Sequence, residues 1–129
     1  MDIDQCACSG RSLDRFLRPA ILAALQAEKS HGYDLVRRLA TMDIFSDAPP
    51  DASGVYKTLR VMEKEGLVVS ALDSGGGGGP ARRSYALTPQ GKACLRQWST
   101  TLRRYREQLD MLLAMLPASA RQRKQKNGS

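Results

Sequence analysis

The sequence predicts a mainly α-helical fold that carries one small β-hairpin and ends in a long helix. Apolar residues recur at helical spacing in several stretches, two short runs of β-forming residues flank a run of glycines, and apolar residues repeat in a heptad pattern near the C-terminus. A chain of 129 residues holds enough material for one domain with a single modest core, but not for two. We therefore expect one globular unit followed by an extension.

The charge of the chain favours a polyanionic partner. The formal net charge is +7 and the sequence pI is near 9.7, which suits nucleic acid but also suits acidic membranes and acidic proteins. Part of this charge lies in residues 117–129, which we expect to form a disordered basic tail. The positive charges of the tail lie on Arg121, Arg123, Lys124 and Lys126.

Nothing in the sequence indicates a membrane or an oxidising compartment. No stretch approaches the roughly 20 apolar residues of a membrane-spanning helix. The acidic residues Asp2 and Asp4 do not resemble the start of a secretory signal. The three cysteines, an odd number, argue against a disulfide framework. We expect a cytoplasmic protein.

The first two helices are predicted from apolar stripes. Residues 1–12 lack a usable periodicity, and we expect them to form a flexible arm. A stripe over residues 13–27 predicts a packing helix, in which Pro19 either kinks the helix or opens its main part. Ser30 is the expected N-cap of a second helix over residues 31–41.

The third predicted helix has one apolar and one basic face. It follows a loop at residues 43–50, begins near Asp51, which is a good N-cap, and ends at Gly66, which is a good C-terminal stop. On a helical wheel one side is apolar, with Val55, Leu59 and Met62. The opposite side is polar and mostly basic, with Ser53, Lys57, Arg60 and Lys64.

A β-hairpin is predicted after this helix. Residues 67–72 are rich in β-formers, and residues 84–88 alternate large side chains with small or polar ones. The glycines at residues 75–79 are the expected flexible tip. A phosphate-binding loop is the other structure that such glycines suggest, but it needs a Gly-Lys-Ser/Thr sequence and a helix directly afterwards, and the chain has neither.

A long helix over residues 89–116 completes the predicted fold. Thr88 and Pro89 resemble its N-cap and first position. Its apolar residues are separated by 3, 4, 3, 4, 3 and 4 residues, which is a heptad seam. The seam consists of Leu95, Trp98, Leu102, Tyr105, Leu109, Leu112 and Leu116. The helix either covers its own domain or pairs with a second copy. We expect a homodimer, because the seam is longer than a small three-helix domain can cover.

The order helix, helix, loop, helix, hairpin is that of a winged helix-turn-helix domain, which we place at residues 13–88. In this design the third helix enters the major groove of double-stranded DNA. Ser53 and Lys57 lie early on that helix, where side chains reach base edges best, and Arg60 follows one turn later. We expect Lys64 to contact phosphate.

The paired arginines after the glycine run are expected to belong to the wing. Because side chains alternate along a strand, only one of Arg82 and Arg83 is expected to meet the DNA backbone or the minor groove. The alternative for the whole segment is a solvated charged helix beside an ordinary hairpin, since Glu63 and Glu65 dilute the positive charge.

Several separated motifs resemble those of PadR-type transcriptional regulators. They are His31-Gly32-Tyr33-Asp34-Leu35, Ser53-Gly54-Val55-Tyr56, the stretch at residues 62–68 and the stretch at residues 79–91. The resemblance covers residues 16–98 and implies a dimeric winged-helix repressor that dimerises mainly through its C-terminal helix. It also implies a DNA-facing set: Tyr33, Ser53, Gly54, Tyr56, Lys57, Arg82 and Arg83. The long glycine run and the arm at residues 6–11 depart from the family pattern.

A regulator bound as a homodimer to an inverted-repeat operator is therefore the function that we expect. A protein-interaction adaptor built on the same fold is the alternative from another class. An enzyme is the least expected class, because the sequence shows no nucleophile and base pair, no dense carboxylate pair and no complete metal motif.

Other residues have two interpretations each. Cys6 and Cys8, with the distant Cys94, either hold a soft metal or sense redox state, or belong to a flexible arm beside a buried thiol. No other cofactor is expected.

Tyr56 either packs in the core or contacts phosphate. A structural or phosphate-adjacent role is expected for His31, the single histidine.

Trp98 lies on the heptad seam, where dimer packing is the default role. Some PadR-type relatives bind planar aromatic effectors between their subunits. By this resemblance Trp98 is a candidate to stack on a small aromatic effector, with Phe16 and Tyr105 as neighbours.

Overall fold

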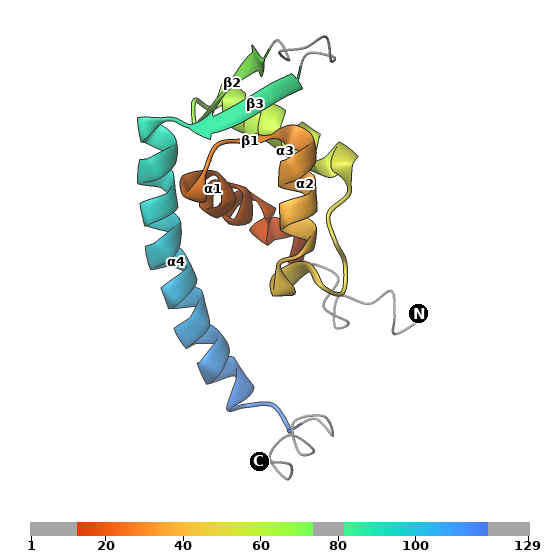
Figure 1. Ribbon diagram of the computed structural model, residues 1–129. Helices are drawn as coiled ribbons and strands as arrows, with labels where there is room; N and C mark the ends of the chain where they lie inside the picture. Colours follow the sequence, from red (N-terminus) through yellow and green to blue (C-terminus); the bar gives the residue numbers. More distant parts are fainter. Residues whose placement is uncertain (1–12, 74–81, 119–129) are drawn as a thin grey trace. The chain divides into compact units, whose positions relative to one another are not determined.

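The computed structural model describes residues 13–73 and 82–118 (Figure 1). The predicted N-terminal arm, the glycine run and nearly all of the predicted basic tail lie outside these residues. The chain divides into two compact units, Met1–Arg96 and Gln97–Ser129. Of the described elements, only the last helix continues from the first unit into the second.

The predicted fold class, mainly helical with a small β-structure, is confirmed (Figure 1). The helices are α1 (Leu17–Ala27), α2 (Gly32–Ala40), α3 (Ala52–Lys64) and α4 (Pro89–Leu113), with short 3₁₀ helices at η3 (Leu13–Phe16) and η4 (Asp43–Phe45). The strands are β1 (Ser30–His31), β2 (Val68–Asp73) and β3 (Arg82–Leu87).

Pro19 opens α1 and does not kink it. The helix begins at Leu17, directly after η3, so Pro19 is its third residue. Backbone N–H groups in the first turn of a helix have no intrahelical acceptor, so the missing N–H of proline removes no hydrogen bond there. Of the two predicted roles, a kink or the opening of the main part of the helix, the structure shows the opening.

The prediction of Ser30 as the N-cap of the second helix is wrong. His31 occupies the N-cap of α2, and Ser30 lies in β1, where it pairs with Tyr85 of β3. The Ser30 hydroxyl donates to the carbonyl oxygen of His31, at 3.1 Å, whereas an N-cap hydroxyl would accept from a backbone N–H of the helix. A strand of two residues shows no alternation along the sequence, so β1 was not predicted.

The sheet is antiparallel with the strand order β1-β3-β2, so β3 is its central strand. The predicted hairpin is present as β2 and β3, in a register that runs from Val68 opposite Leu87 to Asp73 opposite Arg82. Strand β3 begins two residues earlier than predicted, at Arg82. Both arginines of the wing therefore belong to the strand.

The predicted ends of α3 are confirmed. The Asp51 carboxylate accepts a hydrogen bond from the backbone N–H of Gly54, at 2.8 Å, which is the bond that an N-cap makes. After the helix, Gly66 adopts a φ of 80°, the left-handed conformation that glycine adopts without strain. The chain then turns directly into β2.

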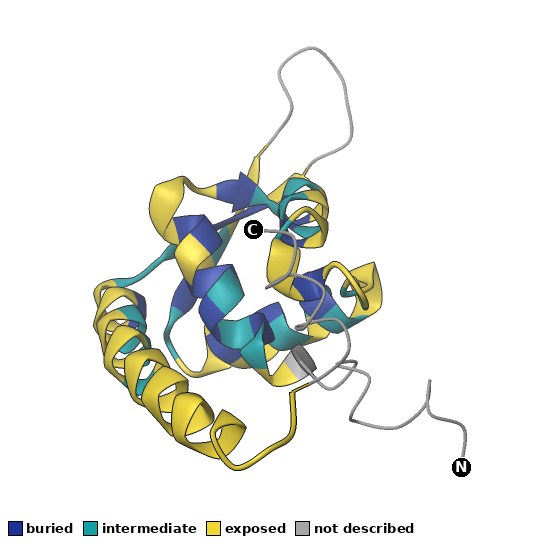
Figure 2. Cartoon of the chain, turned by 90° about the horizontal axis from the view of Figure 1, so that it is seen from below, coloured by how far each residue is buried: buried dark blue, intermediate teal, exposed yellow. Residues whose placement is uncertain are grey.

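The core of the first unit is formed by α1, α2, α3 and the sheet (Figure 2). Its largest fully buried side chains are Ile21, Leu22, Leu35, Leu39, Val55, Leu59, Met62 and Val68. Polar contacts join the helices nearer the surface. Arg18 of α1 pairs with Glu65 at the end of α3, and Arg38 of α2 donates to the carbonyl oxygen of Ala24, at 2.6 Å. These contacts link α1 to α2 and to the end of α3.

Helix α4 starts in close contact with the turn that ends α3. Thr88 caps it as predicted, because its hydroxyl oxygen accepts from the backbone N–H of Gly91, at 3.0 Å. The same hydroxyl donates to the carbonyl oxygen of Gly66. A Cβ atom at Gly91 would overlap the carbonyl group of Leu67, so a glycine is required at this position.

The predicted heptad seam lies on α4 and just beyond its end. Leu95 and Trp98 are half-buried, and the remaining seam residues are exposed in the single chain: Leu102, Tyr105, Leu109, Leu112 and Leu116. Cys94 is half-buried. Within the described ranges, no helix is long and apolar enough to cross a membrane.

The burial of Tyr85 generates a prediction about alkaline stability. Its side chain is 5% exposed, and burial raises the pKa of its hydroxyl above the ordinary value of 10.0, while the positive charge of Arg83 opposes the shift. A raised pKa means that the folded state holds the proton more tightly, so this stabilisation is complete below pH 10.0 and is lost as the pH rises through the folded-state pKa.

Urea unfolding of the wild type and of Tyr85→Phe from about pH 8 to about pH 11 tests this linkage. The free energy of unfolding of the wild type should fall relative to that of Tyr85→Phe at the alkaline end. Tyr33→Phe, at an exposed position, is the control and should follow the wild type. A constant difference between the wild type and Tyr85→Phe across the range would contradict the prediction.

Candidate nucleic-acid interface

The polar face of α3 is open to solvent. Val55, Leu59 and Met62 have no exposed surface, and this anchors the helix by its apolar stripe. The residues predicted to meet DNA project from the other side: Ser53, Lys57, Arg60 and Lys64, all exposed. Gly54 is half-buried, and its N–H is occupied by Asp51. Three positive charges and a hydroxyl therefore lie along a single helix face of a width that fits the DNA major groove.

A cleft of about 350 Å³ lies beside this face. It brings together residues from the start of α2, from α3 and from β3: His31, Gly32, Tyr33, Asp34, Tyr56, Arg82 and Arg83. Four residues of the predicted DNA-facing set thus line one cavity, although they lie far apart in the sequence. The cavity contains two guanidinium groups and two phenol hydroxyls, which are donors that suit phosphate oxygens.

Tyr56 packs against the backbone and also lines the cleft. It is half-buried, and its ring packs on the backbone of Gly32, where an added Cβ atom would overlap the ring. It also lines the cleft. Tyr33 is 66% exposed, and the guanidinium group of Arg37 lies 5.9 Å from the centre of its ring.

The two arginines of the wing have different surroundings. Arg83 donates to the hydroxyl oxygen of Ser70, at 2.9 Å, and this hydroxyl donates to Glu63 of α3, at 2.7 Å. Arg82 lies opposite Asp73 at the end of the β2 and β3 ladder. Ser70 was not predicted to take part, because its contact with Glu63 depends on how α3 packs on β2 and has no sequence pattern.

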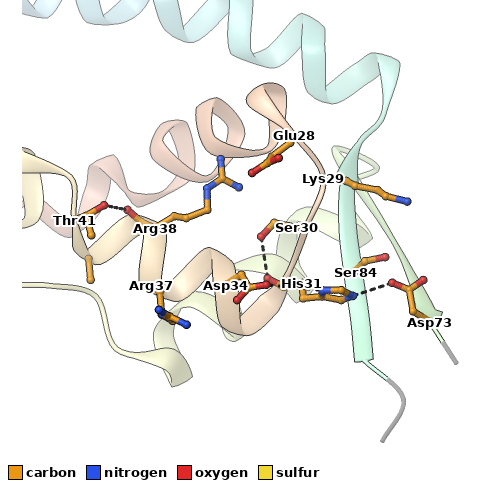
Figure 3. A pocket seen from close by; sticks show the side chains of 11 residues that line it. Glu28, Lys29, Ser30, His31, Asp34, Arg37, Arg38, Thr41, Asp73 and Ser84 are labelled. Atoms are coloured by element: carbon orange, nitrogen blue, oxygen red, sulfur yellow. Dashed lines mark hydrogen bonds and ion pairs between the residues drawn. The ribbon is translucent and has the colours of Figure 1, made fainter. Parts of the chain in front are cut away.

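His31 stands between two carboxylates (Figure 3). Its Nε2 atom lies 2.8 Å from Asp73 and its Nδ1 atom lies 3.9 Å from Asp34. The histidine therefore joins the start of α2 to the last described residue of β2. This fits the structural role that the sequence suggested.

A larger cleft of about 850 Å³ adjoins His31 (Figure 3). Its charged lining is balanced, with Lys29, Arg37 and Arg38 facing Glu28, Asp34 and Asp73. Such a surface does not favour a polyanion.

A third groove, of about 480 Å³, lies along the start of α3, and its charged lining is mainly basic: Arg15, Arg18, Lys57 and Asp51. This groove extends the positive surface from Lys57 towards η3 and α1.

The described residues contain no group of three or more histidine, cysteine, aspartate or glutamate side chains that could hold a metal ion. Cys6 and Cys8, the predicted metal ligands, lie outside the described residues, so the structure does not test them.

The chain resembles known proteins over most of its length. Residues 21–97 match the model of the transcriptional regulator PadR-like family. Transcriptional regulator YqjI of Escherichia coli K12 is 30% identical over 96 residues, which are 74% of this chain and 40% of that protein. The chain thus spans well under half the length of this curated relative.

Solved structures show the same fold. A PadR family transcriptional regulator from Eggerthella lenta DSM 2243 superposes with a TM-score of 0.70 at 27% identity, over 83% of this chain and 89% of that one. Bacillus subtilis PadR in complex with operator DNA superposes with a TM-score of 0.58 at 26% identity, over 65% of this chain and 46% of that one.

The packing of Tyr56 on Gly32 generates a prediction about substitution at Gly32. Gly32→Ala should destabilise the protein by about 1–3 kcal/mol, because the added methyl group overlaps the ring. In a Tyr56→Ala background the ring is absent, and the same substitution should instead stabilise by about 0.4–1 kcal/mol, as Gly→Ala does in an unobstructed helix. Urea unfolding of the four proteins in this cycle measures both effects. An equal cost in the two backgrounds would show that the ring does not impose the glycine.

Proposed function

Because the chain belongs to the PadR-like family of transcriptional regulators, we propose that it is a repressor that binds, as a homodimer, to an inverted-repeat operator. The observation that carries this proposal is the exposed face of α3, which presents Lys57, Arg60 and Lys64 opposite a fully buried stripe. A helix anchored in this way presents the same side chains outwards in every molecule, as sequence recognition requires.

The contacts divide into two kinds. Ser53, Lys57 and Arg60 face base edges in the major groove, where arginine and lysine pair best with guanine. Lys64 and the cleft beside α3, with Tyr33, Tyr56 and Arg82, take the phosphate groups that flank the groove. The likeness to Bacillus subtilis PadR, whose structure contains operator DNA, supports DNA as the partner.

The homodimer is proposed from the seam on α4. Its leucine and tyrosine side chains from Leu102 onwards are exposed in the single chain, and a contiguous apolar face of this kind favours association. Two copies related by a two-fold axis would present two α3 helices to DNA, so the two half-sites should be inverted repeats separated by about one helical turn or a multiple of it.

The signal that releases DNA is a further part of the proposal. A small aromatic molecule that stacks on Trp98 or Tyr105 would alter the pairing of the α4 helices and so the separation of the two α3 helices. Metal or redox sensing through Cys6 and Cys8 is a separate hypothesis about residues outside the described ranges. A cytoplasmic location is also part of the proposal, because the proposed partner is DNA.

Selection of duplexes from a random-sequence DNA library by the purified protein tests the DNA-binding function. The selected sequence should be an inverted repeat, and its affinity should fall steeply with salt because phosphate contacts release counterions. The Lys57→Ala/Arg60→Ala protein should bind it at least about tenfold more weakly, since each base contact contributes about 1–3 kcal/mol.

Lys92→Ala/Arg96→Ala removes the same two residue types at exposed positions of α4 and is the matched control, which should bind as the wild type does. Equal affinity of the wild type for all DNA sequences would refute the repressor. If the affinity of the wild type for DNA depends only weakly on salt, and the α3 substitutions leave this affinity unchanged, a protein-interaction adaptor would be favoured.

The oligomeric state is tested by Leu109→Asp. A charge within the seam should convert the dimer to a monomer, because a buried unpaired carboxylate is strongly unfavourable. Gln108→Asp introduces the same charge at the neighbouring exposed position, outside the seam, and should remain dimeric. Sedimentation velocity of the three proteins distinguishes the states. A monomeric wild type at micromolar concentration would show that α4 does not dimerise the chain.

A further inference from the structure

A chain of hydrogen bonds joins α3 to both strands of the wing. Glu63 lies on α3, Ser70 lies on β2 and Arg83 lies on β3. The Ser70 hydroxyl oxygen is 2.7 Å from Oε2 of Glu63 and 2.9 Å from Nη1 of Arg83. One hydroxyl group therefore contacts both charged side chains, each from a different element.

The direction of these bonds is fixed by chemistry. A carboxylate only accepts and a guanidinium only donates, so the single hydroxyl hydrogen of Ser70 points to Glu63 and its lone pairs point to Arg83. Both bonds have a charged partner, which makes each stronger than a neutral hydrogen bond, and the two bonds polarise each other. A hydroxyl is required at residue 70, since alanine could neither donate nor accept.

The stability of the fold does not depend on this chain. Glu63 and Arg83 are exposed and Ser70 is half-buried. Hydrogen bonds at such exposed positions stabilise a fold less than the burial of one core leucine does. The larger effect of these bonds is therefore on orientation.

The place of the chain in the sheet shows what it orients. Ser70 pairs with Tyr85 and Arg83 pairs with Leu72, so alternation puts Ser70 and Arg83 on the same face of the β2 and β3 ladder. Glu63 approaches that face from the C-terminal half of α3, one turn beyond Arg60. This brace adds a polar link between α3 and the far part of β2 to the turn at residues 65–67 and the packing of Val68.

We propose that Ser70 is a positioning residue, which couples the wing to α3 by holding Glu63 and Arg83 together. Arg83 acts as the brace, and Arg82, which is not part of the chain, is the wing arginine that contacts DNA. This inference rests on the proposed function. It predicts that sequence-specific binding, which needs α3 and the wing to engage one half-site together, depends on Ser70, whereas non-specific binding, which needs only positive charge, does not.

The experiment compares Ser70→Ala, Ser70→Thr and Val69→Ala in the full chain. Ser70→Thr keeps the hydroxyl and suits a strand, and Val69→Ala trims the neighbouring residue, which is 52% exposed. The probes are the duplex that the wild type selects from random DNA and a scrambled duplex of the same composition, with thermal unfolding measured on every variant.

Ser70→Ala should lose about tenfold in affinity for the selected duplex, equivalent to about 1.4 kcal/mol. Its affinity for the scrambled duplex and the salt dependence of binding should be unchanged, because no charge has been removed. Ser70→Thr should restore the affinity, and Val69→Ala should retain it. A role of Ser70 in folding alone would instead lower the melting temperature and weaken both duplexes together, which would overturn the inference.

Different results would refute the repressor function and the role of Ser70. If the wild type selects no sequence, the repressor is refuted and this inference is refuted with it. If the wild type selects a sequence and Ser70→Ala binds it as tightly, the repressor stands and only the inference is overturned. If Arg83→Ala lowers the salt dependence while Arg82→Ala does not, Arg83 is the DNA contact and the assignment of the two arginines is wrong.

Discussion

The burial of one apolar stripe on α3 is the constraint on which the rest of the interface depends. The rotation of a packed helix about its own axis decides which of its side chains face solvent. The complete burial of Val55, Leu59 and Met62 fixes this rotation for α3. The positions of Lys57 and Arg60 follow from this by geometry alone. An inward rotation of α3 would bury a charge and expose a fully buried side chain, so burial of the stripe is enough to keep Lys57 and Arg60 facing outwards.

Around this helix, three features of the backbone bring the neighbouring elements close together. Gly32 allows Tyr56 to lie on the start of α2, and this close approach joins α2 and α3. Gly66 lets the chain turn from α3 into β2 within a few residues. The central position of β3 then holds the strand of Arg82 and Arg83 between β1 and β2. The candidate interface is thus assembled by close backbone packing, with long charged side chains added at its surface.

Most of this arrangement was predictable because it is local. The N-caps at Asp51 and Thr88 and the stop at Gly66 follow from side chains and conformations within a few residues of each helix end. The elements that were missed or misplaced depend on distant partners. Strand β1 forms because β3 lies beside it, and Ser30 joins that strand and does not cap α2. The hydrogen bonds of Ser70 likewise require α3, β2 and β3 to be in place first.

The start of α4 has a mechanical consequence. Thr88 bonds to Gly66, and Gly91 lies against Leu67, so the first turn of α4 touches the residues that directly follow α3. These contacts are a hydrogen bond from the short side chain of Thr88 and a close approach of the two backbones. A rotation or displacement of this turn must therefore either break both contacts or move the end of α3 with it. A rotation of α4 would therefore be transmitted to α3 through Gly66 and Leu67.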